Sequence, residues 1–260
     1  MNKGPLDLSS TRILLCNDDG IHAPGLEVLE KAARALAKEV WVVAPETEQS
    51  GVSHSLTLHR PLRTREIGKR RFAVDGTPSD CVLLAINHLM ADHRPDLVLS
   101  GINRGGNMGE DITYSGTIAA AMEATLLGVP AIALSQIADS EETARWATAT
   151  AHFADVVRRV TSIDWPRSVF INVNFPDVPA DEVSGVLVTR QGRRKLGDEL
   201  WERADPRGRP YFWIGPMRAE EGTRRGSDLA AVNQGAISVT PLYLDLTHER
   251  MLDALKEVFR

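Results

Sequence analysis

The sequence predicts an α/β protein whose core is a doubly wound, mostly parallel sheet. Two observations support this fold class. Short apolar runs alternate with segments of helical periodicity through the first 176 residues, which is the pattern of successive β-α-β units. Runs such as Ile13-Leu14-Leu15 are also apolar without a break, which is typical of strands that helices cover on both faces. With 260 residues, 43% of them hydrophobic, the chain is long enough for one such domain and an appendage.

The core elements follow from apolar spacing and from the residues that end each run. Each predicted strand is a short apolar run, and each predicted helix repeats apolar residues along one face. Thr77 is a good N-cap and Pro78 a good first residue for the second helix. In chain order the elements are a strand at 12–16, a helix at 26–37, a strand at 40–44, a helix from 78 through 89, a strand at 96–100, a helix at 117–127, a strand at 131–134, a helix at 141–160 and a strand at 169–173.

Two stretches depart from this alternation. Residues 46–77 predict an inserted hairpin with short strands at 53–58 and 71–74. Residues 185–225 mix strand-like pieces with the basic turn 190–195 and have little apolar surface of their own. We therefore expect a β-hairpin arm that packs on another subunit or reaches over the site.

The chain accordingly divides into three predicted parts. Residues 1–176 form the catalytic core, 177–235 the extended oligomerisation arm, and 236–260 a strand and helix that return to the core or to a partner subunit. The last part begins with an apolar strand at 236–239, which follows a short helix starting at Ser227-Asp228, and it ends with an amphipathic helix.

Composition restricts the classes of partner. The net charge of −5 argues against a general basic surface for duplex nucleic acid. No apolar run approaches the about 18 residues of a membrane span, and the N-terminal residues lack the pattern of a signal peptide. The two cysteines, Cys16 and Cys81, fall inside predicted core elements, as reduced thiols of a cytosolic protein do. We expect a cytoplasmic protein without membrane or duplex partners.

Two adjacent carboxylates follow the first predicted strand. Asp18 and Asp19 come directly after Asn17 and precede Gly20, which permits a tight turn. Two like charges side by side are costly to bury unless a cation or hydrogen-bond donors offset them. Oxygen ligands of this kind favour a divalent cation such as Mg²⁺ or Mn²⁺. The alternative interpretation is an ordinary Asp-Asp-Gly turn.

We expect polar groups from three loops to meet at one edge of the sheet. If the first strand is central, right-handed crossovers bring 17–20, 46–55 and 101–117 to the carboxyl ends of the strands, where open α/β sheets bind ligands. A hydroxyl and an amide carbonyl beside two carboxylates would make an oxygen shell for a hard cation. The polar residues of these loops are Asp18, Asp19, Ser50, His54, Asn103, Asn107, Asp111, Ser115 and Thr117.

The third of these loops also predicts an anion site. It is rich in glycine, and Ser115-Gly116-Thr117 stands at the amino end of the helix 117–127, where free amides and the helix dipole favour an anion. A metal beside an anion pocket indicates phosphoryl chemistry. Ser115 and Thr117 could instead only cap the helix. Neither the dinucleotide fingerprint G-x-G-x-x-G nor a Walker motif occurs, which argues against a nicotinamide dehydrogenase.

Several basic and histidine residues have two interpretations. His54 either contacts substrate or is a solvated loop histidine, and the other histidines lack zinc-like spacing. Six basic residues of the arm are interpreted as solvated or subunit-pairing charges, with contact to polyanionic substrates as the alternative. They are Arg190, Arg193, Arg194, Lys195, Arg224 and Arg225.

The chain resembles the SurE (survival protein E) family through a series of motifs in the same order. The resemblance covers about residues 11 to 176 and returns at 238–242. The motifs are Ile13-Leu14-Leu15 with Asn17-Asp18-Asp19-Gly20-Ile21-His22-Ala23-Pro24-Gly25, Val42-Val43-Ala44-Pro45 through Gln49-Ser50-Gly51, His54-Ser55-Leu56-Thr57, Gly76-Thr77-Pro78-Ser79-Asp80-Cys81, Ser100-Gly101-Ile102-Asn103-Arg104-Gly105, Asn107-Met108-Gly109, Tyr114-Ser115-Gly116-Thr117 and Ser238-Val239-Thr240-Pro241-Leu242.

The resemblance implies a Rossmann-like domain whose arm is exchanged between the subunits of a dimer, often paired into tetramers. It implies one divalent metal ion per subunit, Mg²⁺ or Mn²⁺. Its ligands would be Asp18, Asp19, Ser50 and Asn103. The phosphate-side loop of the family matches Asn107, Ser115, Gly116 and Thr117.

The activity that we expect is metal-dependent hydrolysis of nucleoside 5′- and 3′-monophosphates. Asp19, Asn107, Ser115 and Thr117 are the candidate catalytic residues, and His54 is a further candidate for substrate binding. Asp19, Asp111 or His54 would manage protons, and a phosphorylated Asp18 is an alternative to direct attack by water. The alternatives in function are a broad phosphatase or exopolyphosphatase acting on polyphosphate, and a non-catalytic, metal-dependent nucleotide-binding protein.

Overall fold

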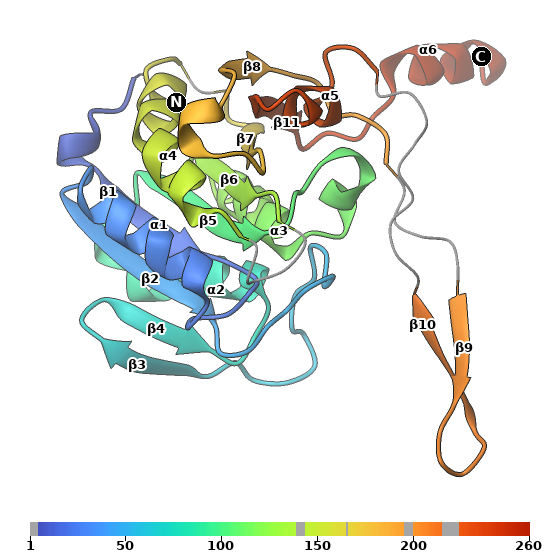
Figure 1. Ribbon diagram of the computed structural model, residues 1–260, viewed down its shortest axis with the longest axis horizontal. Helices are drawn as coiled ribbons and strands as arrows, with labels where there is room; N and C mark the ends of the chain where they lie inside the picture. The colour runs from blue at the N-terminus through green and yellow to red at the C-terminus, as the bar shows by residue number, and fades with distance from the viewer. Residues whose placement is uncertain (1–4, 139–143, 165, 195–199, 215–223) are drawn as a thin grey trace.

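The computed structural model describes residues 5–138, 144–164, 166–194, 200–214 and 224–260. It contains a nine-stranded sheet of order β3-β4-β2-β1-β5-β6-β7-β11-β8 and a separate two-stranded hairpin, β9 with β10 (Figure 1). The strands are β1 Arg12–Cys16, β2 Glu39–Pro45, β3 Thr64–Gly68, β4 Arg71–Val74, β5 Leu97–Arg104, β6 Ala131–Gln136, β7 Val169–Phe175, β8 Val186–Val188, β9 Leu200–Ala204, β10 Pro210–Ile214 and β11 Ile237–Tyr243. The α-helices are α1 Pro24–Arg34, α2 Pro78–Leu84, α3 Gly116–Leu126, α4 Trp146–Thr161, α5 Asp228–Asn233 and α6 Glu249–Val258.

Helices cover both faces of this sheet, as the unbroken apolar strands require. On β1, Ile13 and Leu15 pack with α1 and α4 in one apolar cluster. Leu14 and Cys16 face the opposite side, in a second cluster with α2 and α3 (Figure 1). The predicted doubly wound α/β fold is therefore confirmed.

The strand order reverses around β1, which pairs in parallel with β2 on one side and β5 on the other. Adjacent carboxyl ends therefore feed the loops after Cys16, Pro45 and Arg104 into one edge of the sheet. The register between β5 and β6 shifts between Ser100 and Asn103, which leaves the end of β5 irregular where the site begins.

The predicted strand at 53–58 is wrong. The partner of β4 in the inserted hairpin is β3, at Thr64–Gly68. Ser53 has a positive φ of 56°, and the amide of Thr57 donates to the side chain of Asp80 at 3.0 Å. The segment thus bonds to loops and side chains in place of a neighbouring strand, a local alternative that Ser and Thr residues often form.

The capping prediction for α2 is confirmed. The Thr77 side chain accepts from the Asp80 amide, the Asp80 side chain accepts from the Thr77 amide, and Pro78 is the first helical residue. The predicted helix at 141–160 begins at Trp146, and residues 139–143 lie outside the described part of the chain. Both cysteines are free and buried.

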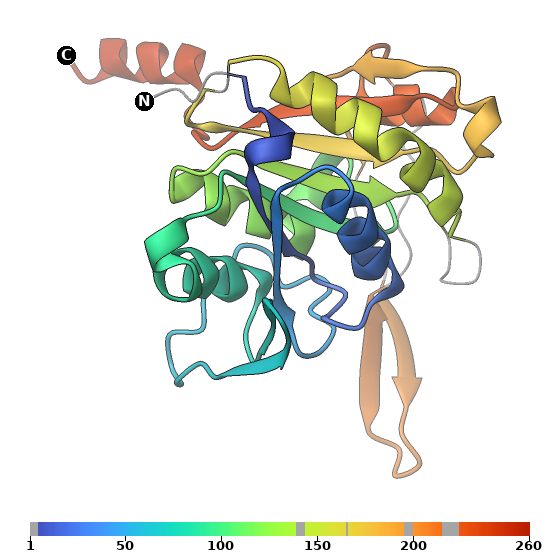
Figure 2. The ribbon, with the colours of Figure 1, turned by 90° about the vertical axis from the view of Figure 1, so that its left-hand side faces the viewer.

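The last two strands of the sheet, β11 and β8, run antiparallel to β7, and the hairpin is separate from the sheet. β11 pairs antiparallel with β7 and parallel with β8. The hairpin β9–β10 projects from the body in both views, and every one of its strand residues is exposed (Figures 1 and 2). Among the helices of the described residues, none has the length and apolar character to cross a membrane.

Candidate functional site

The two carboxylates of the loop after β1 line two neighbouring cavities. Nδ2 of Asn17 donates to the carbonyl of Gly20 at 2.9 Å, and Gly20 has a φ of +101°, so the turn is closed tightly. Asp18 lines a cavity of about 450 Å³, which we call the Asp18 cavity. Asp19 lines a neighbouring cavity of about 290 Å³, the Asp19 cavity. Arg104 lines both cavities and so marks the boundary between them.

Asp18 is held at the amino end of α3. Oγ1 of Thr117 donates to its Oδ1, and the amides of Gly116 and Thr117 also favour its charged form. A Cβ on Gly116 would lie 2.7 Å from the Cβ of Asp18, so only glycine permits this approach. Burial nonetheless raises the pKa of Asp18, because these donors do not fully replace water. The anion that α3 receives in this structure is thus a carboxylate of its own chain.

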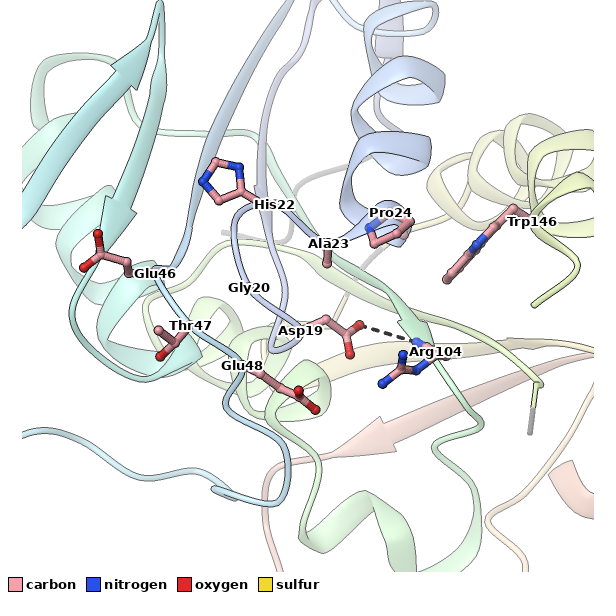
Figure 3. Close-up of a pocket in the computed structure, with 11 residues that line it drawn as sticks. Asp19, Gly20, His22, Ala23, Pro24, Glu46, Thr47, Glu48, Arg104 and Trp146 are labelled. Atoms are coloured by element: carbon pink, nitrogen blue, oxygen red, sulfur yellow. Dashed lines mark hydrogen bonds between the residues drawn. The ribbon is translucent and has the colours of Figure 1, made fainter. Parts of the chain in front are cut away.

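Asp19 lies beside this buried charge. Burial first, and then the charge of Asp18, raise the pKa of Asp19 to about 7. Its Oδ2 accepts from the amide of Arg104 at 3.4 Å, and Figure 3 shows its carboxylate turned toward Arg104 above the side chain of Glu48. Two adjacent carboxylates whose pKa values are both raised by burial fit a divalent cation, which would offset both charges.

Ser50 and Asn103 meet Asp18 at its cavity, as the loop argument predicts. The hydroxyl of Ser50 donates to Oε1 of Glu48 at 2.8 Å, and Nδ2 of Asn103 donates to the carbonyl of Gly105 at 2.8 Å. Their oxygen atoms therefore keep lone pairs for a ligand. No cluster of three or more His, Cys, Asp or Glu suited to a metal occurs in the described ranges. A cation here would need the mixed carboxylate, hydroxyl and amide set.

Two contacts fasten the loop that carries Ser50. The amide of Gln49 donates to the carbonyl of Asp18 at 2.8 Å, and the amide of Ser53 donates to the carbonyl of Tyr114 at 3.0 Å. This loop is therefore tied both to the turn after β1 and to the loop after β5. The predicted convergence of the three loops is confirmed.

Asn107 is fixed by a buried network that the sequence analysis missed. Its amide donates to Oδ1 of Asn174 and its Nδ2 to Oγ of Ser135, both at 2.9 Å. Its carbonyl accepts from Nδ2 of Asn172 at 2.7 Å. Asn107 lines the Asp18 cavity while its backbone and side-chain nitrogen atoms are engaged, so its Oδ1 has a defined position. Asn172 and Asn174 sit on β7, too far along the chain for a local motif to reveal them.

Ser115 caps α3 and lines the Asp18 cavity as well. Its Oγ accepts from the amide of Ile118 at 3.1 Å, while the residue also lines a third cavity of about 590 Å³. His54 lies in this third cavity, which we call the His54 cavity, and not in the Asp18 cavity. Its Nε2 contacts Oε2 of Glu123 at 2.8 Å, so His54 is a partly buried, paired side chain, and it does not line the Asp18 cavity. Glu123 lies in α3, about two turns after the N-cap Ser115. No motif in the sequence indicated that it would contact His54.

The interpretation of the arm arginines needs one correction. Arg194 lines the Asp18 cavity, where its Nε donates to Oδ2 of Asp111 at 3.0 Å. It is therefore not a solvated or subunit-pairing charge, because the turn at its base packs against the loop after β5. Arg193, Arg224 and Arg225 are exposed, and Lys195 lies outside the described residues. Asp111 forms an ion pair with Arg194. Its carboxylate is therefore engaged by a cation and is not a free proton acceptor.

The chemistry of the cavity follows from these contacts. Carboxylate, hydroxyl and amide oxygens suit a hard cation, and Arg194, Asn107 and Ser115 suit an anionic group beside it. Cation and anion sites that share one cavity fit hydrolysis of a phosphate ester.

Comparisons with known proteins agree on one family. The family model described as Survival protein SurE matches residues 13–198. A curated 5′-nucleotidase SurE of Paramagnetospirillum magneticum is 60% identical over 253 residues, covering 97% of this chain and 97% of its own. That of Rhodospirillum rubrum is 58% identical, with 97% and 98% coverage. The crystal structure of SurE from Aquifex aeolicus is similar with a TM-score of 0.82 and 41% identity, covering 96% of this chain and 100% of its own.

Proposed function

This chain belongs to the survival protein SurE family and is a 5′-nucleotidase, and we propose that it hydrolyses nucleoside 5′- and 3′-monophosphates with the help of a divalent metal ion. The observation that carries this proposal is the single cavity in which Asp18, Ser50 and Asn103 face Asn107, Ser115 and Arg194. Relatives that match almost the whole chain bear the nucleotidase name.

The metal would be one Mg²⁺ or Mn²⁺ ion held by Asp18, Asp19, Ser50 and Asn103. When bound, it would polarise a phosphoryl oxygen and supply acidified water. The chain's own contribution is to aim Asp18 from the amino end of α3 and to fix Asn103 through Gly105. The raised pKa of Asp19 supports a cation at this place, because ionisation of both carboxylates is otherwise unfavourable.

The phosphate group would lie against Asn107 and Ser115. The Oδ1 of Asn107 can accept a hydrogen bond from a water molecule or from a protonated phosphoryl oxygen, and the hydroxyl of Ser115 can donate to a phosphoryl oxygen. Gly116 and Thr117 act through Asp18, whose carboxylate their amides and hydroxyl contact. Of the candidate proton acceptors, Asp111 accepts from the side chain of Arg194 and His54 contacts Glu123. Burial and the charge of Asp18 raise the pKa of Asp19 to about 7, which suits a general base near neutral pH. We therefore propose Asp19 for proton transfer.

The nucleoside would lie in the His54 cavity. This cavity touches the Asp18 cavity at Ser115 and is lined by apolar side chains, among them Met122, Phe170 and Leu242. An apolar cavity with a few polar groups at its wall suits a base and ribose. His54 and Arg190 are such polar groups.

Assembly and location are further proposals. The hairpin exposes large apolar side chains, including Phe212 at 57% and Trp213 at 62%, which supports a homo-oligomer in which the arm packs on a second subunit. A cytoplasmic location stays a prediction from the sequence.

The proposal is tested by phosphate release from a panel of 5′- and 3′-nucleoside monophosphates. The assay is run with Mg²⁺ or Mn²⁺, with EDTA, and with Asp18→Asn in parallel, using Asp253→Asn on the exposed face of α6 as the matched control. We expect release that requires metal, is lost in Asp18→Asn and persists in the control. Nucleotide binding without release would favour the binding-protein alternative, and release from polyphosphate above all nucleotides would favour the exopolyphosphatase.

A further inference from the structure

Arg194 is a cationic side chain that the arm places inside the Asp18 cavity. Its Nε and Nη2 both donate to Oδ2 of Asp111, and Nη2 also approaches the carbonyl of Gly106 at 3.4 Å. Within the described part of the chain no acceptor contacts Nη1. The Arg194 side chain is 19% exposed, and it lines the cavity together with Asp18 and Asn107. One edge of the guanidinium is thus held by Asp111, and among the described residues the other edge has no partner.

Backbone packing holds the turn that carries Arg194. The buried carboxylate of Asp228 accepts from the amides of Gly109 and Gly192 at 3.1 and 2.8 Å. Gly109 has a φ of +55°, and a Cβ there would lie 2.8 Å from the amide nitrogen of Arg194. Only a glycine at 109 lets the turn approach this closely. The position of Arg194 is therefore set before any ligand binds, which lowers the entropy cost of binding through it.

The cavity needs such a cation. Asp18 and Asp111 line it and repel a phosphate dianion, while the lining cations are Arg104 and Arg194. Arg104 is exposed and borders the Asp19 cavity as well. Arg194 is the half-buried one, and its forked geometry suits a phosphoryl group. Asp111 is 6% exposed, and among the residues that the structure describes its Oδ1 has no hydrogen-bond partner, so its carboxylate orients Arg194 through Oδ2.

We propose that Arg194 binds the phosphoryl group of the nucleotide in the Asp18 cavity, and that Asp111 is the residue that positions its guanidinium. The proposal rests on the proposed function, since it assigns a phosphate contact to that same cavity. It differs from an ion pair that only fastens the arm. Loss of a pair that only fastens the arm would lower the stability of the fold and the affinity for every ligand alike. Loss of a phosphate contact lowers the affinity only for ligands that carry phosphate.

The test compares inhibition by inorganic phosphate with inhibition by a nucleoside, in the full-length, metal-loaded protein. The variants are Arg194→Ala and Arg194→Lys, and Arg193→Ala is the exposed neighbour that serves as control. We expect Arg194→Ala to weaken phosphate inhibition by about tenfold or more, as for loss of a charge-assisted hydrogen bond, and to leave nucleoside inhibition within about twofold. Arg194→Lys should recover part of the loss, because it keeps the charge and loses the fork.

Asp111→Asn tests the positioning role separately. It keeps the guanidinium charge but weakens its orientation, so we expect kcat to fall by about tenfold while phosphate inhibition changes by less than about threefold. Unchanged kcat in Asp111→Asn would overturn the positioning role. Equal losses for phosphate and nucleoside in Arg194→Ala, or unchanged phosphate inhibition, would overturn the phosphate contact.

A direct binding measurement separates this inference from the proposed function. Calorimetric titration of inorganic phosphate into each metal-loaded variant measures the contribution of Arg194 to phosphate affinity without any turnover. If the wild-type protein releases no phosphate from any nucleotide, the proposed function fails, and the titration still decides the role of Arg194. If nucleotides are hydrolysed and phosphate binds Arg194→Ala and wild type equally, only the inference fails.

Discussion

The site edge of the sheet and the β9–β10 hairpin break the usual rule of burial in opposite directions. At the site, polar side chains are buried, with Asp18 4% and Asn107 6% exposed. On the hairpin, apolar side chains are exposed, with Trp213 at 62% and Ile214 at 75%. Each region is unfavourable alone, because charges lose water in the first and apolar surface meets water in the second.

The difference teaches what each region needs to be complete. The site already satisfies most of its polar groups with hydrogen bonds, and what remains is charge, so the missing component is a small ion or an anionic ligand. The hairpin pairs its two strands only with each other and leaves its apolar side chains uncovered, and an isolated hairpin is marginally stable in water. Its missing component is another protein surface, for which a second copy of the chain is the simplest candidate.

The largest expected effect comes from removing a polar group on the site side of the comparison. Asn107→Ala keeps the backbone bonds to Asn172 and Asn174 and removes only the side chain that faces the cavity. We expect kcat/KM for a nucleotide to fall by about 100-fold, as for loss of one preorganised polar group.

Ser135→Ala is the matched control for this change. It removes only the partner that orients Nδ2 of Asn107, so a loss of about tenfold or less is expected. Equal losses in the two variants, together with a lower melting temperature in both, would show that Asn107 serves the fold alone.

The next effect lies on the hairpin side. Trp201 and Trp213 are cross-strand partners on the hairpin, and their joint replacement by serine removes two exposed indole rings from it. We expect the assembly to dissociate at least about tenfold more readily in sedimentation experiments, while the circular dichroism of the core stays unchanged. Arg207→Ser in the exposed turn is the control. A wild-type chain that sediments as a monomer at all concentrations would remove the need for a partner surface.

A smaller effect concerns the stability of the metal-free protein. The folded-state pKa of Asp19 is about 7, above the about 3.9 of an unfolded aspartate. Protonated Asp19 therefore makes its whole contribution to the free energy of unfolding below pH about 4. That contribution is lost as the pH rises through about 7. In EDTA we expect a melting temperature about 3 °C lower at pH 8 than at pH 5.5.

Asp19→Asn supplies the reference for this pH dependence. It should reduce the decrease between pH 5.5 and pH 8, and Mn²⁺ should raise the melting temperature of the wild type more at pH 8 than at pH 5.5. The same pH dependence in the variant and the wild type would assign it to other groups.

The smallest effect is expected at His54. His54→Gln keeps a polar contact to Glu123 and alters only the wall of the His54 cavity. We expect KM for a nucleotide to rise about threefold with inhibition by inorganic phosphate unchanged, measured by steady-state kinetics. A change in phosphate inhibition without a change in nucleoside inhibition would place the nucleoside elsewhere.

The sequence predicts this molecule well where signals are local. Alternation of apolar runs predicted the strand order around β1, and the rule for carboxyl ends of strands predicted that Asp18, Ser50 and Asn103 would meet. It failed at 53–58, where serine and threonine contacts replace strand pairing. The sequence named Arg194 but did not predict its pairing with Asp111, because that contact spans 83 residues and no periodicity encodes such a distance.

The base of the arm has an evolutionary consequence. The amide of Arg190 donates to the carbonyl of Gly226 at 3.1 Å, and the amide of Asp228 donates to the carbonyl of Arg190 at 3.0 Å, so the chain leaves and re-enters the body at one point. Insertions and deletions confined to the hairpin, between Leu200 and Ile214, leave both this entry point and Arg194 in place. Changes in the length or surface residues of the hairpin can therefore alter quaternary structure during evolution. The catalytic centre in the body stays intact.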